Sequence, residues 1–561
     1  MLHGGTGKDE VYVQPAHYLR RMGIPREFVK PYGTGEDVRD WVIMPSQWIV
    51  FPYDAELKPL TEPLPPSLLV HLRPHKTVLE NSVISGSIKK KETQLKWFEF
   101  RRLARAKFAV KLNIIVPQIA THAHFVIADH TVVFKEKAQA IALNNSIEKR
   151  DLPLLTGVLN SSLVLERLKQ ECFSKRESAE PEKDTYYEFS GGKLEEIRLA
   201  GTLVDALSGG EHPSSTRIRE LAEACWNKGK EMPSLALRKL FEKPTEAYND
   251  WYGRLSGHLA PQPGHSPPFD TTAALRKEYQ RIFSLRDQFR GKMIDLQEDI
   301  DWVVYALYGL LPLDHPAIQT GGETICLDRE KRPFHLLLAA EADYTQAVAM
   351  IPASWSESRK KVWESRLAVI HKNENIRRLE QPIHKRRWDE QWKVGNQWRC
   401  GPVAYAAELV DAFEWWLREK AEWWLENKKA GGPVEFDDWA KALWKDERVN
   451  AAWPVAAEEY AKLQYDKALQ KTYENDEPAP PPIAPAAEFI SFRRELKRIV
   501  DEETVAENIP FAVPYEELEK KLKRKVPGNV SKVRGKLNVP RERFHLRDKT
   551  QYLWAGLQFK Q

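Results

Sequence analysis

The chain has 561 residues, of which 42% are apolar and 29% are charged, and its net charge is +5. A chain of this length is too long for one ordinary core, so we expect two to four domains. The small net charge excludes binding to nucleic acid through total charge alone, so any such contact must come from clustered cations.

The four cysteines (Cys172, Cys225, Cys326 and Cys400) lie far apart and form no C-x-x-C pair. This spacing argues against a disulfide framework or a cysteine-based zinc site, and it suits a reducing compartment. The first ten residues contain no apolar signal core, and no run of about 18 apolar residues occurs. We therefore predict a cytoplasmic protein with no membrane partner.

Short strands are predicted along the first 51 residues. Residues 11–13 are typical of a strand. Residues 41–44 and 48–51 are two β-prone runs on either side of a Pro-Ser-Gln sequence, which predicts a hairpin. A Pro-rich passage then leads toward residue 89.

Residues 89–111, which we call the basic segment, combine many cations with the aromatic residues Trp97, Phe98, Phe100 and Phe108. The segment has two acids, Glu92 and Glu99, against nine cations: Lys89, Lys90, Lys91, Lys96, Arg101, Arg102, Arg105, Lys107 and Lys111. This clustering is typical of a surface that contacts nucleic-acid phosphates, with the aromatic side chains packed onto a core. The alternative is a solvated face of a helix, and residues 91–108 are compatible with one.

Strands follow the basic segment. Residues 113–116 are β-branched, and residues 125–134 contain two apolar runs on either side of Asp129 and His130, which predicts a hairpin. His122, His124 and His130 lie nearby, but no carboxylate has the spacing to complete a metal site with them. We therefore predict that His122 and His124 are polar residues of a loop or groove.

Residues 152–172 predict a helix with one apolar stripe, interrupted by Ser161 and Ser162. Residues 186–196 predict a last strand followed by a glycine turn. Strands, hairpins and one or two helices predict a single α+β domain over residues 1–205.

The pattern then becomes helical. Apolar residues recur every three or four positions over residues 275–307, which predicts a long helix, and residues 403–430 predict a second one. Trp415, Trp416, Trp423 and Trp424 form two pairs on this second helix, with Trp416 and Trp423 seven positions apart, and we interpret them as packing residues in preference to base-stacking platforms. We predict a helical spacer or scaffold domain over residues 206–472.

The C-terminal part begins with a Pro- and Ala-rich linker over residues 473–488. A small basic domain is predicted over residues 489–561, where Lys520 to Lys549 contain twelve Lys and Arg residues against two acids. This second cluster of cations also suits a phosphate-contacting surface.

Motifs of catalysis are incomplete. Residues 266–269 have the sequence Ser-Pro-Pro-Phe, which fits the loose pattern of a loop that holds a flipped base, but no strand precedes them, so we interpret them as a helix-entry loop. Neither Gly33 to Gly35 nor Gly191-Gly192 has the context of a phosphate-binding loop. We find no Walker lysine, H-E-x-x-H motif or nucleophile elbow, and so no complete catalytic centre.

An ordered set of segments resembles a known family. KPYGTGEDVRDW, IIVPQIA, LPLLTGVLNSSLVLERLKQECF and YYEFSGGKLEE resemble the target-recognition domain of large adenine-specific DNA methyltransferases. LQEDIDWVVYALYGL, EQPIHKRRW and VPRERF are similar to segments of the PglX methyltransferases of BREX phage-defence systems and of type IIG restriction–methylation enzymes. The resemblance extends from about Phe28 to Phe544.

The resemblance implies a division of labour. In the family an N-terminal half binds S-adenosylmethionine and holds the catalytic loop, and this sequence begins where that half would end. We therefore expect the target-recognition half, made either as a separate polypeptide that docks on a catalytic subunit or as the remainder of an interrupted gene, with no catalytic residue, cofactor or metal of its own. S-Adenosylmethionine is expected on a separate methyltransferase catalytic subunit, and the other expected partners are double-stranded DNA and further proteins of the defence system.

The candidate DNA contacts follow from residue type and position. Adenine methylation requires a flipped base, and specificity then comes from a domain that grips the duplex. The predicted contacts to phosphates are Lys30, Arg39, Arg101, Arg102, Arg105, Lys107 and Lys111. The predicted contacts to bases are Gln118 for adenine, Arg39 or Lys193 for guanine, and His122 or His124.

Two other hypotheses stay open. In the first hypothesis, the chain is a complete S-adenosylmethionine-dependent methyltransferase of unrecognised fold, with residues 266–269 as its catalytic loop. Alternatively, it is a non-enzymatic protein–protein scaffold of a defence complex, with Trp415 to Trp424 as its contact face.

Overall fold

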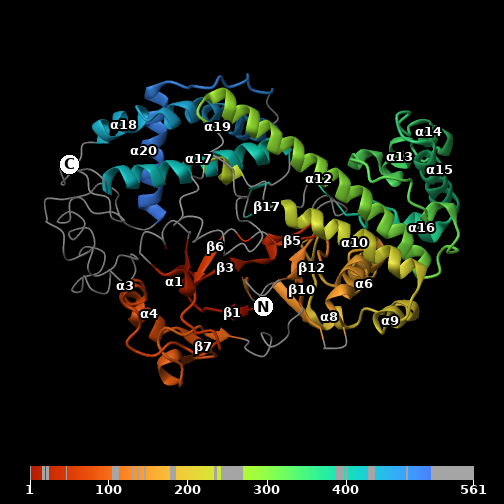
Figure 1. Ribbon diagram of the computed structural model, residues 1–561, viewed down its shortest axis with the longest axis horizontal. Helices are drawn as coiled ribbons and strands as arrows, with labels where there is room; N and C mark the ends of the chain where they lie inside the picture. Colours follow the sequence, from red (N-terminus) through yellow and green to blue (C-terminus); the bar gives the residue numbers. More distant parts are fainter. Residues whose placement is uncertain are drawn as a thin grey trace.

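A computed structural model gives the fold of this protein (Figure 1). It describes residues 2–14, 19, 24–43, 45, 47–103, 113–128, 132–135, 138–143, 147–176, 185–232, 237–241, 269–386, 388, 393–394, 397–398, 401–426, 436–475 and 478–506.

The N-terminal part is built on a six-stranded mixed sheet with the order β2-β6-β3-β13-β1-β9. Strand β13 lies parallel to both β1 and β3, and the other pairings are antiparallel. The strands are β1 (Leu2–Gly5), β2 (Val13–Gln14), β3 (Val29–Gly33), β6 (Gln47–Val50), β9 (Arg102–Leu103) and β13 (Val133–Phe134). Helices α3 (Pro66–Leu72) and α4 (Lys76–Glu80) contribute to the same hydrophobic core as this sheet. The strand predicted at residues 11–13 is wrong in part, because helix α1 (Asp9–Tyr12) occupies two of those residues.

The described residues also form two three-stranded antiparallel sheets and three two-stranded ribbons. In one sheet β10 (Asn113–Pro117) lies between β12 (Val126–Ala128) and β14 (Ala138–Ala142), so the strand predicted at 113–116 is confirmed. In the other, β16 (Tyr186–Glu188) lies between β11 (Ile119–Ala120) and β15 (Ser174–Arg176). The ribbons are β4 (Val38–Arg39) with β5 (Val42–Ile43), β7 (Val83–Ser85) with β8 (Ile88–Lys89), and β17 (Lys393–Val394) with β18 (Gln397–Trp398).

Both predicted hairpins are wrong. Strand β5 pairs backward with β4 and not forward with β6, because Asp40 and Trp41 have positive φ angles of 40° and 68° and form a tight turn between β4 and β5. Positive φ at both central residues matches the twist of a two-residue hairpin turn. Similarly, β12 pairs with β10 whereas β13 belongs to the six-stranded sheet, so the two runs in residues 125–134 serve different sheets.

The basic segment does not form the helix predicted over residues 91–108 where the structure describes it. A short 3-10 turn (Lys90–Glu92) leads into a loop and then into β9. The four consecutive residues from Trp97 to Phe100 are all buried, which a helix with one buried face cannot achieve. Lys90 is buried too, and its ammonium group donates to the carbonyl oxygens of Trp97 and Glu99.

The predicted helix over residues 152–172 is divided into two. Helix α5 (Leu152–Leu159) ends at Asn160, and helix α6 (Ser162–Glu171) starts after Ser161, whose hydroxyl accepts from the backbone N–H of Val164. Further on, β16 confirms the strand predicted near residue 186, and the two glycines that follow begin helix α8 (Gly191–Glu195). Helices α9 (Gly201–Leu207) and α10 (Pro213–Glu231) come next.

The predicted long helix is confirmed as α12 (Thr272–Leu307), which runs across the molecule (Figure 1). Its N-terminal half shares a hydrophobic core with α17 (Gly401–Glu426), α18 (Phe436–Trp444), α19 (Glu447–Glu474) and α20 (Phe489–Ala506). Its C-terminal half shares another core with α5, α6, α10, α13 (Pro333–Ala339), α14 (Tyr344–Ala349), α15 (Glu357–Lys372) and α16 (Glu374–Leu379). One helix therefore connects two cores.

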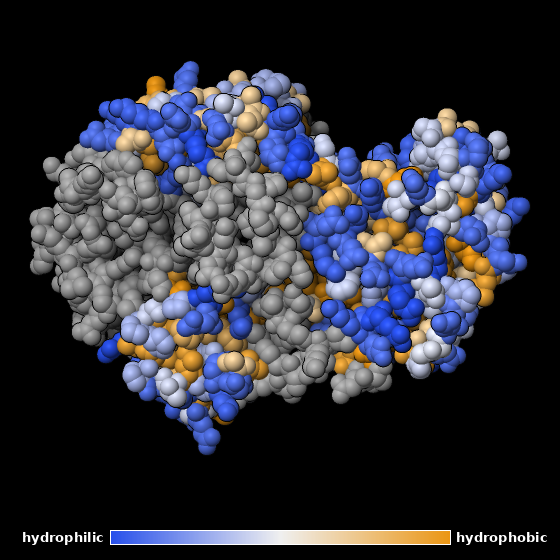
Figure 2. All heavy atoms as spheres, in the orientation of Figure 1, coloured by the Kyte–Doolittle hydropathy of each residue, from blue (hydrophilic) through white to orange (hydrophobic). Residues whose placement is uncertain are grey.

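The second predicted helix is confirmed as α17, and Trp415 and Trp416 are buried in the core that it shares with α12. The side chains of Trp423 and Trp424 lie outside the described residues. On the face shown in Figure 2, most of the described surface is hydrophilic and hydrophobic side chains form smaller patches, as expected when such helices bury their apolar faces.

The α+β class is confirmed: most of the strands lie in the N-terminal part, and the described part after β16 is helical apart from the β17–β18 ribbon. The domain boundaries stay predictions. The boundary at residue 205 separates α5 and α6 from α10 and α12, although these helices share one core. The predicted linker over residues 473–488 is wrong at its start, because α19 continues to Glu474, whereas residues 478–488 form neither helix nor strand and are mostly exposed. None of the helices in the described part of the chain combines the length and the apolar character that a bilayer crossing requires.

The close contact between α10 and the β4–β5 turn makes a testable prediction. A Cβ atom on Gly229 would lie 2.6 Å from the carbonyl oxygen of Trp41, so Gly229→Ala must displace backbone. We expect the free energy of unfolding to fall by about 1 to 3 kcal/mol, as overpacking does elsewhere. Urea unfolding followed by circular dichroism measures the change. Gly201→Ala is the matched control, because a Cβ atom there meets nothing within 4 Å. Equal stability of the two variants would contradict the close packing.

Candidate nucleic-acid interface and the buried network behind it

The predicted phosphate contacts Lys30 and Arg39 are only partly exposed. The ammonium group of Lys30 lies 5.1 Å from the centre of the Phe51 ring, and burial lowers the pKa of Lys30. Arg39 donates to the carbonyl oxygens of Gly35 and Val38. Burial also lowers the pKa of Arg39, against the opposite effect of Asp40 and other nearby acids. Both cations therefore already contact groups of this protein, the Phe51 ring for Lys30 and two backbone carbonyl oxygens for Arg39.

Two of the predicted phosphate contacts in the basic segment, Arg101 and Arg102, lie at the start of β9. Arg102 lies opposite Gly5 of β1 and its side chain is exposed, whereas Arg101 is half-buried and its backbone N–H donates to Thr6. The other three predicted cations of this segment, Arg105, Lys107 and Lys111, lie outside the described residues. Of the described pair, Arg102 is the better placed for a phosphate.

The predicted base contacts Gln118 and Lys193 lie near the β11–β16–β15 sheet. The amide of Gln118 donates to Glu188 Oε1 over 2.9 Å, and the other carboxylate oxygen of Glu188 is 2.6 Å from the ammonium group of Lys175. The ammonium group of Lys193 lies 3.1 Å from Glu196 and 3.7 Å from Glu171. The hydrogen bond to Glu196 raises the pKa of Lys193. Gln118 and Lys193 thus both already contact carboxylates of this protein.

His122 and His124 lie in a loop, as predicted, but both side chains are buried. His122 Nε2 donates to the carbonyl oxygen of Lys385 over 3.0 Å. His124 Nδ1 accepts from the backbone N–H of Asp40 over 3.4 Å. Burial, together with Arg386 and Arg39, lowers the pKa of His124 well below its ordinary value. Contact between these histidines and DNA stays a prediction that their burial does not favour.

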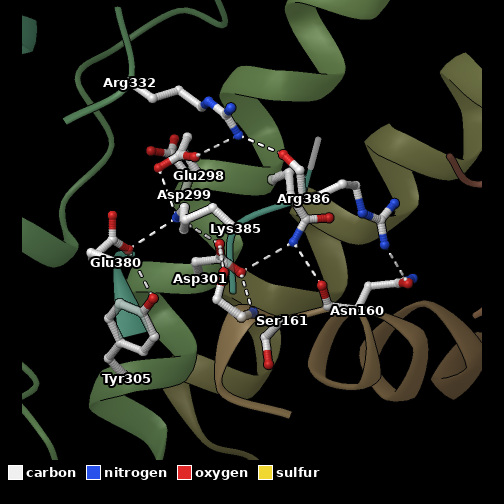
Figure 3. A network of polar contacts seen from close by, with 12 residues as sticks. Asn160, Ser161, Glu298, Asp299, Asp301, Tyr305, Arg332, Glu380, Lys385 and Arg386 are labelled. Carbon is white, nitrogen blue, oxygen red and sulfur yellow. Dashed lines mark hydrogen bonds and ion pairs between the residues drawn. The ribbon is translucent and has the colours of Figure 1, made fainter. Parts of the chain in front are cut away.

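His122 and His124 adjoin a buried polar network that is centred on Lys385 (Figure 3). The ammonium group of Lys385 lies 2.8 Å from Asp301, 2.9 Å from Glu380 and 3.0 Å from Glu298, and all four side chains are at most 2% exposed. Tyr305 donates its hydroxyl hydrogen to Glu380 over 2.8 Å. Three carboxylates from two elements therefore surround one cation.

The same network reaches α6 through Asp301. The backbone N–H of Ser162 donates to Asp301 Oδ1 over 3.0 Å, and the Ser162 hydroxyl donates to Asp301 Oδ2 over 2.6 Å. Gln297 also donates to Asp301 and to the backbone carbonyl of Asn160. A single carboxylate on α12 thus fixes the turn between α5 and α6.

The neighbouring Arg386 extends the network to the β4–β5 turn. Its guanidinium group donates to the side-chain oxygen of Asn160 over 2.6 Å and lies 3.5 Å from Asp40 Oδ1. Arg332 in turn donates to the carbonyl oxygen of Arg386 over 2.7 Å. The Asn160 side chain is also bonded to both backbone polar groups of Phe125. Arg386 therefore connects α5, the segment before β12 and the β4–β5 turn.

Two further buried ion pairs attach α15 to the same helix. Arg359 contacts Asp295 through two nitrogen atoms, at 2.5 Å and 3.1 Å, and Arg366 lies 2.7 Å from Asp299. Arg366 also donates to the carbonyl oxygen of Ala317 over 2.9 Å. The acidic stretch of α12 is consequently paired with cations from α15 and from residues 385–386.

Burial changes the proton affinity of these groups. Burial raises the pKa of Glu298, and Glu380 and Asp301 add to this rise while Lys385 opposes it. Burial alone would lower the pKa of Lys385, but its three carboxylates raise it above the ordinary value. Burial raises the pKa of Asp40 to about 6, although Arg386 acts in the opposite direction. Lys385 therefore keeps its proton more tightly than an ordinary lysine, and Glu298 and Asp40 keep theirs more tightly than ordinary carboxyl groups.

Sequence reasoning missed Lys385 and Arg386 as organising residues. A signal was present in the acidic stretch from Asp295 to Asp301, which directly precedes the apolar run from Trp302 to Leu307, and in the cations that follow His384. Buried acids on a long helix need cations from elsewhere in the fold. The pairing itself joins residues 84 and 87 positions apart, so periodicity could not reveal it.

No group of three or more His, Cys, Asp and Glu side chains is arranged to hold a metal ion within the described part of the chain. The Ser-Pro-Pro part of residues 266–269 lies outside the described residues. Phe269 is described, and its buried ring packs edge-on against Phe241 at 5.8 Å. Phe269 is therefore a core residue.

Comparison with known proteins gives two similarities. A family model described as a domain of unknown function, DUF7008, matches residues 293–561. The chain is also similar to the adenine-specific methyltransferase PglX of Streptomyces coelicolor, with 24% identity over 626 residues, covering 99% of this chain and 44% of the relative. The chain thus spans less than half the length of the curated relative it matches. The similarity is weak in identity but extends along the whole chain.

Removal of the central cation provides a test of the network. Lys385→Met leaves three buried carboxylates without their shared partner, and we expect the free energy of unfolding to fall by about 3 to 5 kcal/mol. The midpoint of urea unfolding measures this loss. Lys360→Met removes an ion pair with the exposed Glu357 and should cost less than about 1 kcal/mol. A loss for Lys385→Met no larger than that of the control would contradict the role of the network.

The raised pKa of Asp40 predicts a pH dependence of stability. Because the folded state holds the proton more tightly than the unfolded chain, the carboxyl group favours folding at low pH, and this contribution disappears as pH rises from about 4 through about 6. Asp40→Asn removes the titration and tolerates the positive φ. The stability of the wild type relative to Asp40→Asn should therefore decrease by on the order of 3 kcal/mol over that range, as measured by urea unfolding at each pH. An increase with pH would show that the ion pair with Arg386 dominates.

Proposed function

We propose that this chain recognises the DNA target for a site-specific adenine-N6 DNA methyltransferase of a phage-defence system. Recognition means that it grips duplex DNA and selects the sequence. The transfer of the methyl group from S-adenosylmethionine is assigned to a methyltransferase part outside these 561 residues. That part is the expected partner, together with double-stranded DNA.

The observation that carries the proposal is the similarity to an adenine-specific methyltransferase along 99% of this chain. The match covers 44% of that relative, which is compatible with one functional part of a larger enzyme. Four of the segments that carry the family resemblance also meet at the network around Lys385: KPYGTGEDVRDW supplies Asp40, LPLLTGVLNSSLVLERLKQECF supplies Ser162, LQEDIDWVVYALYGL supplies Asp301, and EQPIHKRRW supplies Lys385. Segments that meet at one network support the family resemblance better than the same segments do when each is considered alone.

The fold supports a recognition role through the rigidity of its strands. A reading surface must hold its side chains in fixed positions relative to the duplex, and a buried network of ion pairs and hydrogen bonds restricts the movement of the elements that it joins. Here the network on α12 fixes the β4–β5 turn, the segment before β12 and the α5–α6 turn. The partly exposed candidate Arg39 directly precedes Asp40 of the β4–β5 turn.

The proposal is tested by binding and cofactor measurements on the same preparation. The chain should bind duplex oligonucleotides at low ionic strength with a preference for some sequences. It should neither bind S-adenosylmethionine in calorimetric titration nor methylate adenine unaided. Methylation by the isolated chain would replace the proposal with a complete methyltransferase, and the absence of any DNA binding would favour a protein–protein scaffold.

The salt dependence of DNA binding gives a residue-level prediction. Removing one cation that neutralises a phosphate should flatten the plot of log K against log salt by about 0.9. The triple substitution of Arg101, Arg102 and Arg105 by Gln should therefore weaken binding to all sequences and flatten the slope by about 2 to 3, as measured by fluorescence anisotropy across salt concentrations. Lys361→Gln with Lys372→Gln on α15 changes two exposed cations away from this region and serves as the control. An unchanged slope in the triple variant would count against phosphate contact by β9.

A further inference from the structure

The β11–β16–β15 sheet exposes an unusual concentration of apolar side chains. Phe173, which directly precedes β15, is 76% exposed, and Ile119 and Tyr186 are 39% and 37% exposed. These residues come from three separate parts of the chain, yet they surround one small sheet. An exposed cluster of this kind marks an interaction site more often than isolated apolar residues do.

The two faces of this sheet differ in character. On the inner face Ala120 and Tyr187 lie opposite each other, where Ala120 is buried and Tyr187 packs against the large core. Ile119 lies opposite Glu188 in the register, so these two side chains share the outer face with Tyr186. The outer face therefore carries apolar residues around one carboxylate.

The carboxylate of Glu188 is fixed in place at the centre of that face. Gln118 donates to one oxygen over 2.9 Å, and the ammonium group of Lys175 lies 2.6 Å from the other. A carboxylate offers about four acceptor positions, so these two contacts leave acceptor capacity directed outward. The side chain of Glu188 is 25% exposed, which keeps this capacity accessible.

A charged group in the middle of an apolar patch favours one kind of partner. The centres of protein–protein interfaces are depleted in charged residues. Nucleobases, in contrast, combine a flat face that stacks on aromatic side chains with an edge that carries hydrogen-bond donors. Carboxylates accept from the exocyclic amine of cytosine, and adenine carries a comparable amine.

We propose that the outer face of the β11–β16–β15 sheet contacts DNA bases, with Glu188 accepting a hydrogen bond from an exocyclic amine and Phe173 stacking on a base. Glu188 is then a specificity-determining residue, and Gln118 and Lys175 are positioning residues that orient its carboxylate. Lys193 lies beside this face, where its ion pairs with Glu171 and Glu196 hold it near the end of α6. This inference rests on the proposed DNA-recognition function and adds the chemical class of the recognised group.

The test compares variants of the full chain in selection from a duplex DNA library with randomised central positions, followed by sequencing of the bound fraction. Glu188→Gln keeps the size of the side chain but replaces an anionic acceptor by an amide. We expect its preference for a cytosine or adenine at one position to fall by about tenfold, with the salt slope unchanged because Glu188 neutralises no phosphate. Glu195→Gln on α8 is the matched control, since Glu195 is exposed and lies off this face.

Phe173→Ala tests the stacking contact separately. Its removal should weaken binding to preferred and other sequences by about tenfold, without a change in melting temperature, because the ring is mostly exposed. If the wild type binds DNA with a sequence preference but both variants behave like Glu195→Gln, this face serves another partner, such as a protein, and the inference is overturned while the proposed function stands. If the wild type binds no DNA, the proposed function fails first.

Discussion

The ammonium group of Lys385 is enclosed by Glu298, Asp301 and Glu380 at a depth where at most 2% of each side chain is exposed. Removing these charges from water costs several kcal/mol per ion, and their mutual attraction offsets this cost only when the geometry is good and the remaining hydrogen-bonding positions are filled. Ser162, Gln297 and Tyr305 fill several of these positions here, whereas Glu380 Oε2 accepts no hydrogen bond from the described residues. Removal of Lys385 would therefore leave three buried carboxylates without their shared cation. The network also requires one relative position of the elements that supply its residues.

This network fixes the positions of several elements relative to helix α12. Helix α12 contributes to two hydrophobic cores, and its acidic stretch also holds α15 through Arg359 and Arg366. Through Arg386 and Asn160 the same network reaches the turn at Asp40 and the segment before β12. The small sheets, whose strands have few residues each, would gain little stability alone. Their positions depend on the helix behind them, which fits a surface that must keep its side chains aligned with a ligand.

Local patterns predicted some elements of the fold well and others badly, for physical reasons. Helix α12 and strand β10 were predictable because an apolar period of three to four residues, or a β-branched run, is a property of consecutive residues. The two hairpins were not, because a strand-like run does not specify its neighbour, and β5 and β13 each pair with a strand other than the one expected. In the basic segment, charge suggested a helix face, whereas burial of Trp97, Phe98 and Phe100 required an irregular loop.

The sequence by itself determined the α+β class, the long helices and the clustering of cations near β9, since composition and periodicity are local properties of the chain. Only the tertiary structure decided that His122 and His124 are buried, that Gln118 donates its amide hydrogen to Glu188, and that Lys385 unites three carboxylates. The physical reason is separation. Gln118 and Glu188 are 70 positions apart and Lys385 and Glu298 are 87 apart, so their contacts arise only when the packing of the cores brings distant segments together.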